Sequence, residues 1–180
     1  QPPTRKQVLR IDGGVPEPVL PSVRQAFERT ALDTIRQGDA VLISDYGSGL
    51  ITPAFVTTIR RTLKGLRRRD GLPIPVLLDR RYRLLKYSGL AGCTPNESEI
   101  EEALGIRIND NRRMLERAGR EVLARTRMQA VLITRGSRGM ALFVRDVPTV
   151  HIPIFCSDSI VDVTGAGDTV VSTVALALAA

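Results

Sequence analysis

The stretch that decides the fold is Asp162-Val163-Thr164-Gly165-Ala166-Gly167-Asp168, which runs directly into Thr169-Val170-Val171-Ser172-Thr173-Val174-Ala175-Leu176-Ala177. Two glycines flank an alanine, a carboxylate follows, and the small and apolar run behind them predicts a buried helix. Glycine lets the backbone turn tightly and approach a ligand closely. The first amides of a helix lack backbone partners and carry the positive end of its dipole. The pattern therefore predicts an anion site, with Asp168 beside it to take a proton from an attacking hydroxyl.

A plainer interpretation of the same residues stays open. Aspartate is a common helix N-cap and Gly-Ala-Gly is a common turn, so neither requires a ligand. A dinucleotide-binding fingerprint fits less well, because Val170 stands where G-x-G-x-x-G needs its third small residue. The chain has no G-x-x-x-x-G-K-S/T motif, and this excludes a Walker-type phosphate loop.

The composition is typical of one globular domain with an aliphatic core. The chain has 180 residues, of which 43% are hydrophobic and only 4% aromatic. Lys and Arg number 26 against 19 Asp and Glu, and the resulting charge of +7 favours anionic partners such as phosphorylated metabolites or nucleotides. Much of this excess positive charge falls on expected helix faces, where a solvated surface explains it better than an anionic partner.

The rare residue types argue against several other classes of protein. Cys93 and Cys156 are the only cysteines and His151 is the only histidine, so a disulfide scaffold, a His-rich metal site and a His-based triad are poorly supported. The N-terminus has no signal-peptide pattern. The last apolar run, 170–180, is too short to cross a bilayer. We therefore expect a soluble cytoplasmic protein without a membrane partner.

Hydrophobic spacing predicts alternating strands and helices. Continuous apolar runs bounded by turn residues indicate strands buried on both faces, and apolar residues three and four apart indicate helices. The expected strands are 40–44, 75–79, 91–94, 130–134, 140–144 and 150–152, with an edge strand at 8–11. The expected helices are 22–36, 52–68, 95–104, 110–126 with Asp110 as its cap, and the one after the glycine turn. This order predicts an α/β layered fold with a mostly parallel sheet and helices on both faces.

The expected loops place polar residues at one rim of that sheet. Ligands of open α/β sheets bind outside the carboxyl ends of the strands. Besides the glycine turn, the residues expected there are Asp45, Asp79, Asn96, Glu99 and Arg135. Their convergence predicts a ligand site. By contrast, the run 67–69 is all arginine without interleaved aromatics and is expected to end a helix, so nucleic acid is not an expected partner.

Together these segments resemble the ribokinase-type (PfkB) carbohydrate kinases. The similarity runs from about residue 4 to residue 180. Within the family, the chain is most similar to the kinase part of the bifunctional heptose-7-phosphate kinases and heptose-1-phosphate adenylyltransferases. The stretches that carry the resemblance are 162–168, Thr94-Pro95-Asn96-Glu97-Ser98-Glu99, Thr134-Arg135-Gly136-Ser137-Arg138-Gly139, Ser44-Asp45-Tyr46-Gly47-Ser48-Gly49 and Arg5-Lys6-Gln7-Val8-Leu9-Arg10.

The resemblance implies a ribokinase-like fold and an ATP-dependent phosphorylation of a sugar or sugar phosphate. The expected acceptor is the anomeric hydroxyl of D-glycero-D-manno-heptose 7-phosphate. Asp168 is implied as the catalytic base in contact with the substrate, and Gly165, Ala166 and Gly167 as the anion hole around the transferred phosphoryl group.

The resemblance also implies two sites for ATP and Mg²⁺. Asn96 and Glu99 match the family's N-x-x-E motif, which organises Mg²⁺ through water near the phosphates; a capping box explains the pair without a metal. The turn that the family places beside the nucleotide is matched here by Thr134, Arg135, Gly136 and Gly139. An ordinary glycine-assisted hairpin is the alternative for that turn.

Two further positions are implied contacts for the sugar and the phosphates. Asp45 lies in a loop that the family turns toward the sugar and its phosphate, although a plain strand-end turn explains it as well. The chain has Asp79-Arg80-Arg81 where the family usually has Asp-Pro-Lys. Arg81 is the expected substitute for that lysine, but a planar guanidinium is not equivalent to an ammonium group.

The family's N-terminal glycine-pair motif is not matched. Gly13-Gly14 is followed by Val15-Pro16 and not by the alanine and asparagine of the family. We therefore expect residues 1–180 to form a single partial kinase domain that lacks the N-terminal sugar-binding and lid segment and the C-terminal end. A noncatalytic binding or scaffold module, or a kinase for another sugar, stays open as an alternative. Relatives often pair through a lid sheet, so a homodimer also stays open.

Overall fold

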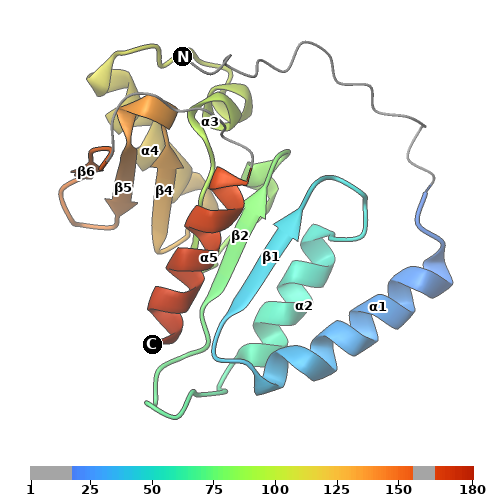
Figure 1. Cartoon of the computed structure of the whole chain (residues 1–180). Coiled ribbons are helices and arrows are strands. Elements are labelled where there is room, and N and C mark those ends of the chain that lie inside the picture. Colours follow the sequence, from blue (N-terminus) through green and yellow to red (C-terminus); the bar gives the residue numbers. More distant parts are fainter. Residues whose placement is uncertain (1–17, 156–164) are drawn as a thin grey trace, which may run out of the picture.

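A six-stranded sheet forms the centre of the computed structural model, which describes residues 18–155 and 165–180 (Figure 1). The strands follow one another across the sheet in chain order: β1 (Val41–Asp45), β2 (Val76–Arg80), β3 (Gly92–Cys93), β4 (Ala130–Thr134), β5 (Met140–Val144) and β6 (Val150–Ile152). The first four are parallel, β5 pairs antiparallel with β4, and β6 pairs antiparallel with β5. The predicted mostly parallel sheet is confirmed. The edge strand expected at 8–11 lies outside the described residues.

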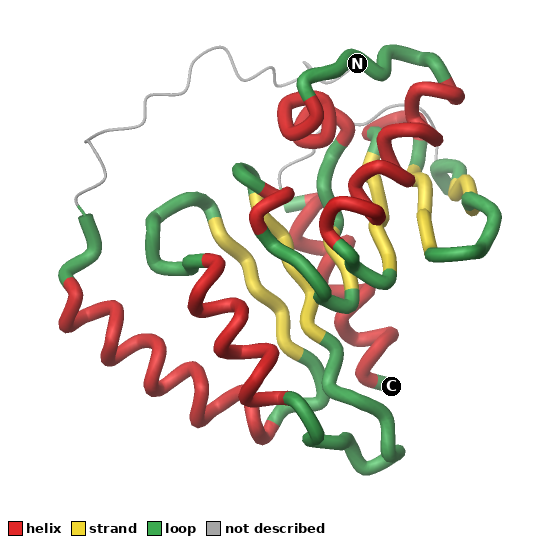
Figure 2. Tube along the Cα trace, turned by 180° about the vertical axis from the view of Figure 1, so that it is seen from behind, coloured by secondary structure: helices red, strands yellow, loops and turns green. Residues whose placement is uncertain are grey.

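Helices cover both faces of the sheet, as predicted. They are α1 (Pro21–Thr34), α2 (Pro53–Leu63), α3 (Glu97–Leu104), α4 (Arg112–Thr126) and α5 (Ala166–Ala179), with short 3-10 segments η1 (Ile35–Gln37), η2 (Leu84–Lys86) and η3 (Gly136–Arg138). Helix α5 contacts β1 and β2 and lies in front of the sheet next to β2 in Figure 1, while Figure 2 shows α2 and α4 on the opposite face. Helix α1 packs against α2.

The two faces of the sheet are buried to different extents. On the α2 and α4 side, apolar residues at helical spacing in α2 meet alternate strand residues such as Val41 and Ile43 in one continuous core. On the other side, Leu42 is still 37% exposed. The apolar run after the glycine turn predicted a buried helix, but Val171 is the only buried residue of α5, and Leu176 is 72% exposed.

The predicted end of α2 and the predicted cap of α4 were wrong. Helix α2 does not continue to residue 68 but ends at Leu63, because Lys64 is extended and Gly65 has a φ of 88°. The arginine run 67–69 therefore does not end a helix. Helix α4 is capped not by Asp110 but by Asn111, whose side chain accepts hydrogen bonds from the two backbone amides of residues 113 and 114.

Cys93 lies within the sheet on the short strand β3, between β2 and β4. The residue is only 2% exposed, and burial raises the pKa of its thiol far above the ordinary range. Its neighbour Gly92 is needed for close strand packing, since a Cβ there would lie 2.9 Å from the carbonyl oxygen of Ala130.

In the ranges that the structure describes, no helix is long and apolar enough to cross a membrane.

Candidate active site

The start of α5 presents open backbone amides. Gly165 adopts a left-handed conformation, with a φ of 77°, directly before the first helical residue, Ala166. The amide and hydroxyl of Thr169 both donate to the carbonyl oxygen of Gly165, at 2.9 and 3.0 Å. The amides of residues 166–168 precede this first helical bond and have no partner within the helix. Residues 165–169 are exposed, and among the described residues nothing beyond the adjoining chain and the helix's own backbone lies within 4 Å of a Cβ built on Gly165 or Gly167.

Asp168 stands on the rim of the sheet, not in the core. It is exposed in the first turn of α5, and the hydroxyl of Tyr46 donates a hydrogen bond of 2.9 Å to its Oδ1 atom. This hydrogen bond and the Asp168 charge raise the pKa of Tyr46. Burial first, and then the charge of Asp168, raise the pKa of Asp79 at the end of β2. The predicted base is thus beside the carboxyl ends of β1 and β2, where Figure 1 also shows the start of α5.

A row of carboxyl groups continues from Asp168 to the start of α3. Burial is the main cause that raises the pKa of Glu99, and the charge of Asp79 raises it further, while Arg81 acts in the opposite direction. Asp168, Asp79 and Glu99 thus lie near enough for their charges to interact, and the predicted convergence of Asp79, Glu99 and the glycine turn is observed.

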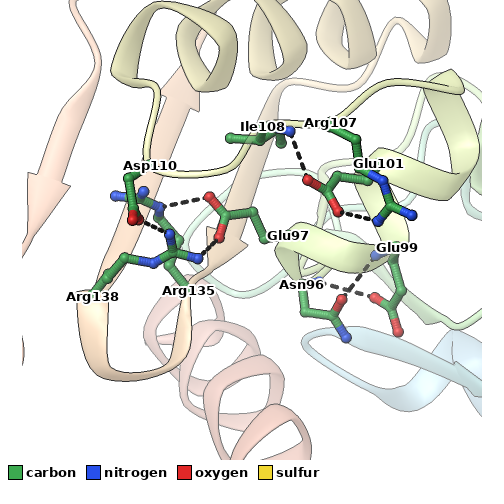
Figure 3. A network of polar contacts seen from close by, with 9 residues as sticks. All are labelled: Asn96, Glu97, Glu99, Glu101, Arg107, Ile108, Asp110, Arg135 and Arg138. Carbon is green, nitrogen blue, oxygen red and sulfur yellow. Dashed lines mark hydrogen bonds and ion pairs between the residues drawn. The ribbon is translucent and has the colours of Figure 1, made fainter.

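Asn96 and Glu99 form the capping box of α3. The backbone amide of Asn96 donates to Glu99 Oε2 at 2.9 Å, and the backbone amide of Glu99 donates to Asn96 Oδ1 at 2.8 Å (Figure 3). The capping alternative is thus observed, and it leaves Glu99 Oε1 for another partner. No group of three or more potential His, Cys, Asp or Glu ligands occurs in the described part of the chain. A water-mediated Mg²⁺ site at this pair stays a prediction.

Substitution of Asn96 separates the capping role from the metal role. We expect Asn96→Ala to lower the unfolding free energy by about 1 kcal/mol, because α3 loses its cap. Asn96→Ser keeps a side-chain acceptor and should restore most of that loss. Urea unfolding measures the stability, and the Mg²⁺ dependence of turnover in the full-length gene product measures the metal role. A serine variant with normal stability and a normal Mg²⁺ requirement would show that Asn96 only caps the helix.

The turn after β4 is joined to the start of α3. The Thr134 amide donates to the Pro95 carbonyl oxygen at 3.0 Å. The Arg135 guanidinium donates to Glu97 at 3.2 Å, and only 13% of the Arg135 side chain and 11% of the Glu97 side chain are exposed. Arg138 pairs with Glu97 and with Asp110 (Figure 3). The turn therefore lies beside the Asn96 motif, as predicted, but its Arg135 side chain is occupied by Glu97.

The glycines of this turn are structural requirements. Gly136 and Gly139 have φ angles of 58° and 77°. A Cβ on Gly139 would lie 2.1 Å from the carbonyl oxygen of Ile152 in β6. The hairpin alternative for these residues is thus observed, and their contact with a nucleotide, like that of Thr134 and Arg135, stays a prediction.

Asp45 is buried in an ion pair and is not presented to solvent. Its side chain is 1% exposed and pairs with Arg80, whose side chain is 9% exposed. Asp45 Oδ1 also accepts a hydrogen bond of 2.8 Å from the Gly47 amide. Arg80 lies over the Tyr87 ring, 4.8 Å from its centroid. The strand-end turn is observed, and the sugar contact of Asp45 stays a prediction. Arg81, the expected phosphate ligand, is exposed beside Glu99.

Sequence reasoning missed Tyr46 and Arg80 as site residues. Tyr46 was noted only as part of the 44–49 stretch, and Arg80 only as a departure from the family pattern. The signal for Tyr46 was its place between the strand-end aspartate and a glycine, at the predicted rim. Nothing in the spacing indicated a partner for Arg80.

The chain matches a known protein family over most of its length. The family model for the pfkB family carbohydrate kinases matches residues 17–180, which include all the residues that form the rim. The chain belongs to the PfkB family.

Curated relatives of this PfkB-family chain are named bifunctional protein HldE. The one from Geobacter metallireducens is 37% identical over 175 residues, which are 97% of this chain and 34% of the relative. The one from Caulobacter vibrioides is 38% identical over 176 residues, again 97% of this chain and 34% of the relative. The chain thus spans about a third of the length of the curated relatives that it matches.

Solved structures show the same ribokinase-like fold. Ribokinase from Arabidopsis thaliana, solved with ribose and ATP, has a TM-score of 0.63 at 24% identity, over 83% of this chain and 45% of that chain. Phosphofructokinase-2 from Escherichia coli, solved with fructose-6-phosphate, has a TM-score of 0.66 at 14% identity, over 84% of this chain and 49% of that chain. These likenesses confirm the fold that the resemblance implied.

Proposed function

We propose that this PfkB-family chain supplies the phosphoryl-transfer part of an ATP- and Mg²⁺-dependent sugar kinase of the cytoplasm. The observation that carries the proposal is the exposed Asp168 carboxylate beside the open amides at the start of α5. The similarity to proteins named HldE supports D-glycero-D-manno-heptose 7-phosphate as the acceptor, phosphorylated at its anomeric hydroxyl.

In the proposed reaction, Asp168 accepts the proton of the acceptor hydroxyl while the oxygen of that hydroxyl bonds to the γ-phosphorus of ATP. The bond between the γ-phosphorus and the β,γ-bridging oxygen breaks, and ADP leaves. The amides of residues 165–167 stabilise the charge on the phosphoryl oxygens. Asn96 and Glu99 would hold Mg²⁺ through water, and this ion neutralises phosphate charge when it is bound.

A noncatalytic binding module is the competing function. The observation that favours it is that Asp45 and Arg135, two of the implied contacts, are occupied by the ion pairs with Arg80 and Glu97. A binding module would hold ATP or a sugar phosphate without turnover.

Substrate-dependent release of ADP distinguishes the two functions. The full-length gene product is assayed with ATP and Mg²⁺ against heptose 7-phosphate, ribose and fructose 6-phosphate. We expect heptose 7-phosphate to give the highest kcat/KM. Preference for another sugar would correct the acceptor but keep the kinase, and binding without ADP release from any sugar would support the noncatalytic module.

A further inference from the structure

Tyr46 is the first residue after β1 and reaches across the rim to the start of α5. Its side chain is 63% exposed, and its hydroxyl lies 2.9 Å from Asp168 Oδ1. Among the described residues, no other side chain is hydrogen-bonded to Asp168, and no Lys or Arg forms an ion pair with it. Tyr46 is thus the group that orients this carboxylate in the described part of the molecule.

The loop that carries Tyr46 is held on both sides. Before it, Asp45 is anchored by the buried ion pair with Arg80. After it, the Gly47 amide donates to the same Asp45 carboxylate at 2.8 Å, and Gly47 has a φ of 88° that favours glycine. A Cβ on Gly47 would lie 3.4 Å from the Tyr82 ring, so Tyr82 borders the loop. The anchored residues Asp45 and Gly47 on either side of Tyr46 therefore fix the direction from which Tyr46 approaches Asp168.

In this contact, Tyr46 acts as a donor. The hydrogen bond to Asp168 and the carboxylate charge raise its pKa, so the phenol stays protonated at neutral pH. A carboxylate has two oxygens, and a donor on Oδ1 leaves Oδ2 with its lone pairs available. Without such a donor, an exposed aspartate can rotate about its last torsion, which is broad.

We propose that Tyr46 is a positioning residue for the catalytic base: its hydroxyl fixes Asp168 Oδ1 so that Oδ2 faces the acceptor hydroxyl. The inference rests on the proposed kinase function. Asp79 of β2 lies near enough to Asp168 that the Asp168 charge, after burial, raises the pKa of Asp79. The contact with Tyr46 is the one that holds the Asp168 side chain itself.

The test is Tyr46→Phe in the full-length gene product, which removes only the hydroxyl. Misplacement of a catalytic group lowers the rate of the chemical step, so we expect kcat to fall by about tenfold with an unchanged KM for the acceptor. Tyr82→Phe is the matched control: Tyr82 is 47% exposed and borders the same loop, and no hydrogen bond joins its hydroxyl to a described residue. It should keep the wild-type kcat, and both variants should unfold at the wild-type temperature.

A double-mutant cycle shows whether Tyr46 acts through Asp168. In the Asp168→Asn background, we expect Tyr46→Phe to cause little further loss, because the base that it positions is already gone. An equal tenfold loss in both backgrounds would assign Tyr46 a separate structural or substrate-binding role. Wild-type kcat in Tyr46→Phe would also overturn the inference while leaving the kinase function intact. If Asp168→Asn itself retains wild-type turnover, it is the proposed function that fails.

Discussion

Asp168→Asn should lower kcat by about 10²- to 10⁴-fold, because an amide cannot accept the proton of the acceptor hydroxyl. Asparagine has the same shape and keeps an oxygen to accept the hydrogen bond that Tyr46 donates to Oδ1. Since residue 168 is exposed, the loss should not arise from unfolding. Steady-state kinetics of the full-length gene product with ATP, Mg²⁺ and heptose 7-phosphate measure the effect.

The control for this variant is Asp33→Asn. Asp33 is also an exposed helical aspartate, but it lies in α1, which packs against α2 away from the rim. We expect it to keep wild-type kcat. Turnover near the wild-type rate in Asp168→Asn would contradict the mechanism, and an equal loss in both variants would indicate a nonspecific charge effect.

Arg80→Ala should lower the unfolding free energy by about 3–5 kcal/mol, because it leaves a buried carboxylate without its partner. Asp45 and Arg80 are adjacent in the parallel register of β1 and β2, and both side chains are almost fully buried. The variant also loses the contact of the guanidinium with the Tyr87 ring. Urea unfolding followed by circular dichroism measures the change.

Two comparisons show that the uncompensated charge causes this loss. Arg125→Ala removes an exposed ion pair with Glu121 in α4, and we expect it to change stability by less than about 1 kcal/mol. The double variant Asp45→Asn/Arg80→Ala should recover part of the stability that Arg80→Ala loses, because it removes the unpaired charge. An equal loss in the double variant would instead point to packing around Tyr87 as the cause.

The order of the helices and strands could be predicted because the hydrophobic pattern of each segment indicates its secondary structure. Strands such as 130–134 are continuous apolar runs, and the apolar spacing of α2 has the helical period. The end of α2 was misplaced because the arginines after Leu63 are good helix formers, whereas the left-handed Gly65 ends the helix. The exposure of α5 could not be predicted, because a local apolar run does not show what packs against it.

The candidate site was predictable only at the level of its loops. The motifs around Asn96 and Gly165 do lie at one rim, since parallel strands share a carboxyl edge. The partners of the charged side chains were not predictable. The pairing of Asp45 with Arg80 depends on strand register, and that of Arg135 with Glu97 joins residues 38 positions apart. Hydrophobic periodicity carries no information on either.

The reactivity of the buried Cys93 thiol measures how often the central strands of the sheet separate. The thiolate is the form that attacks a thiol reagent, and this form is suppressed while β3 stays packed between β2 and β4. With Cys156 replaced by serine, the labelling rate of Cys93 would therefore measure transient separation of the central strands. Ligands that bind at the carboxyl ends of these strands would lower this labelling rate, even in a preparation in which no turnover is detectable.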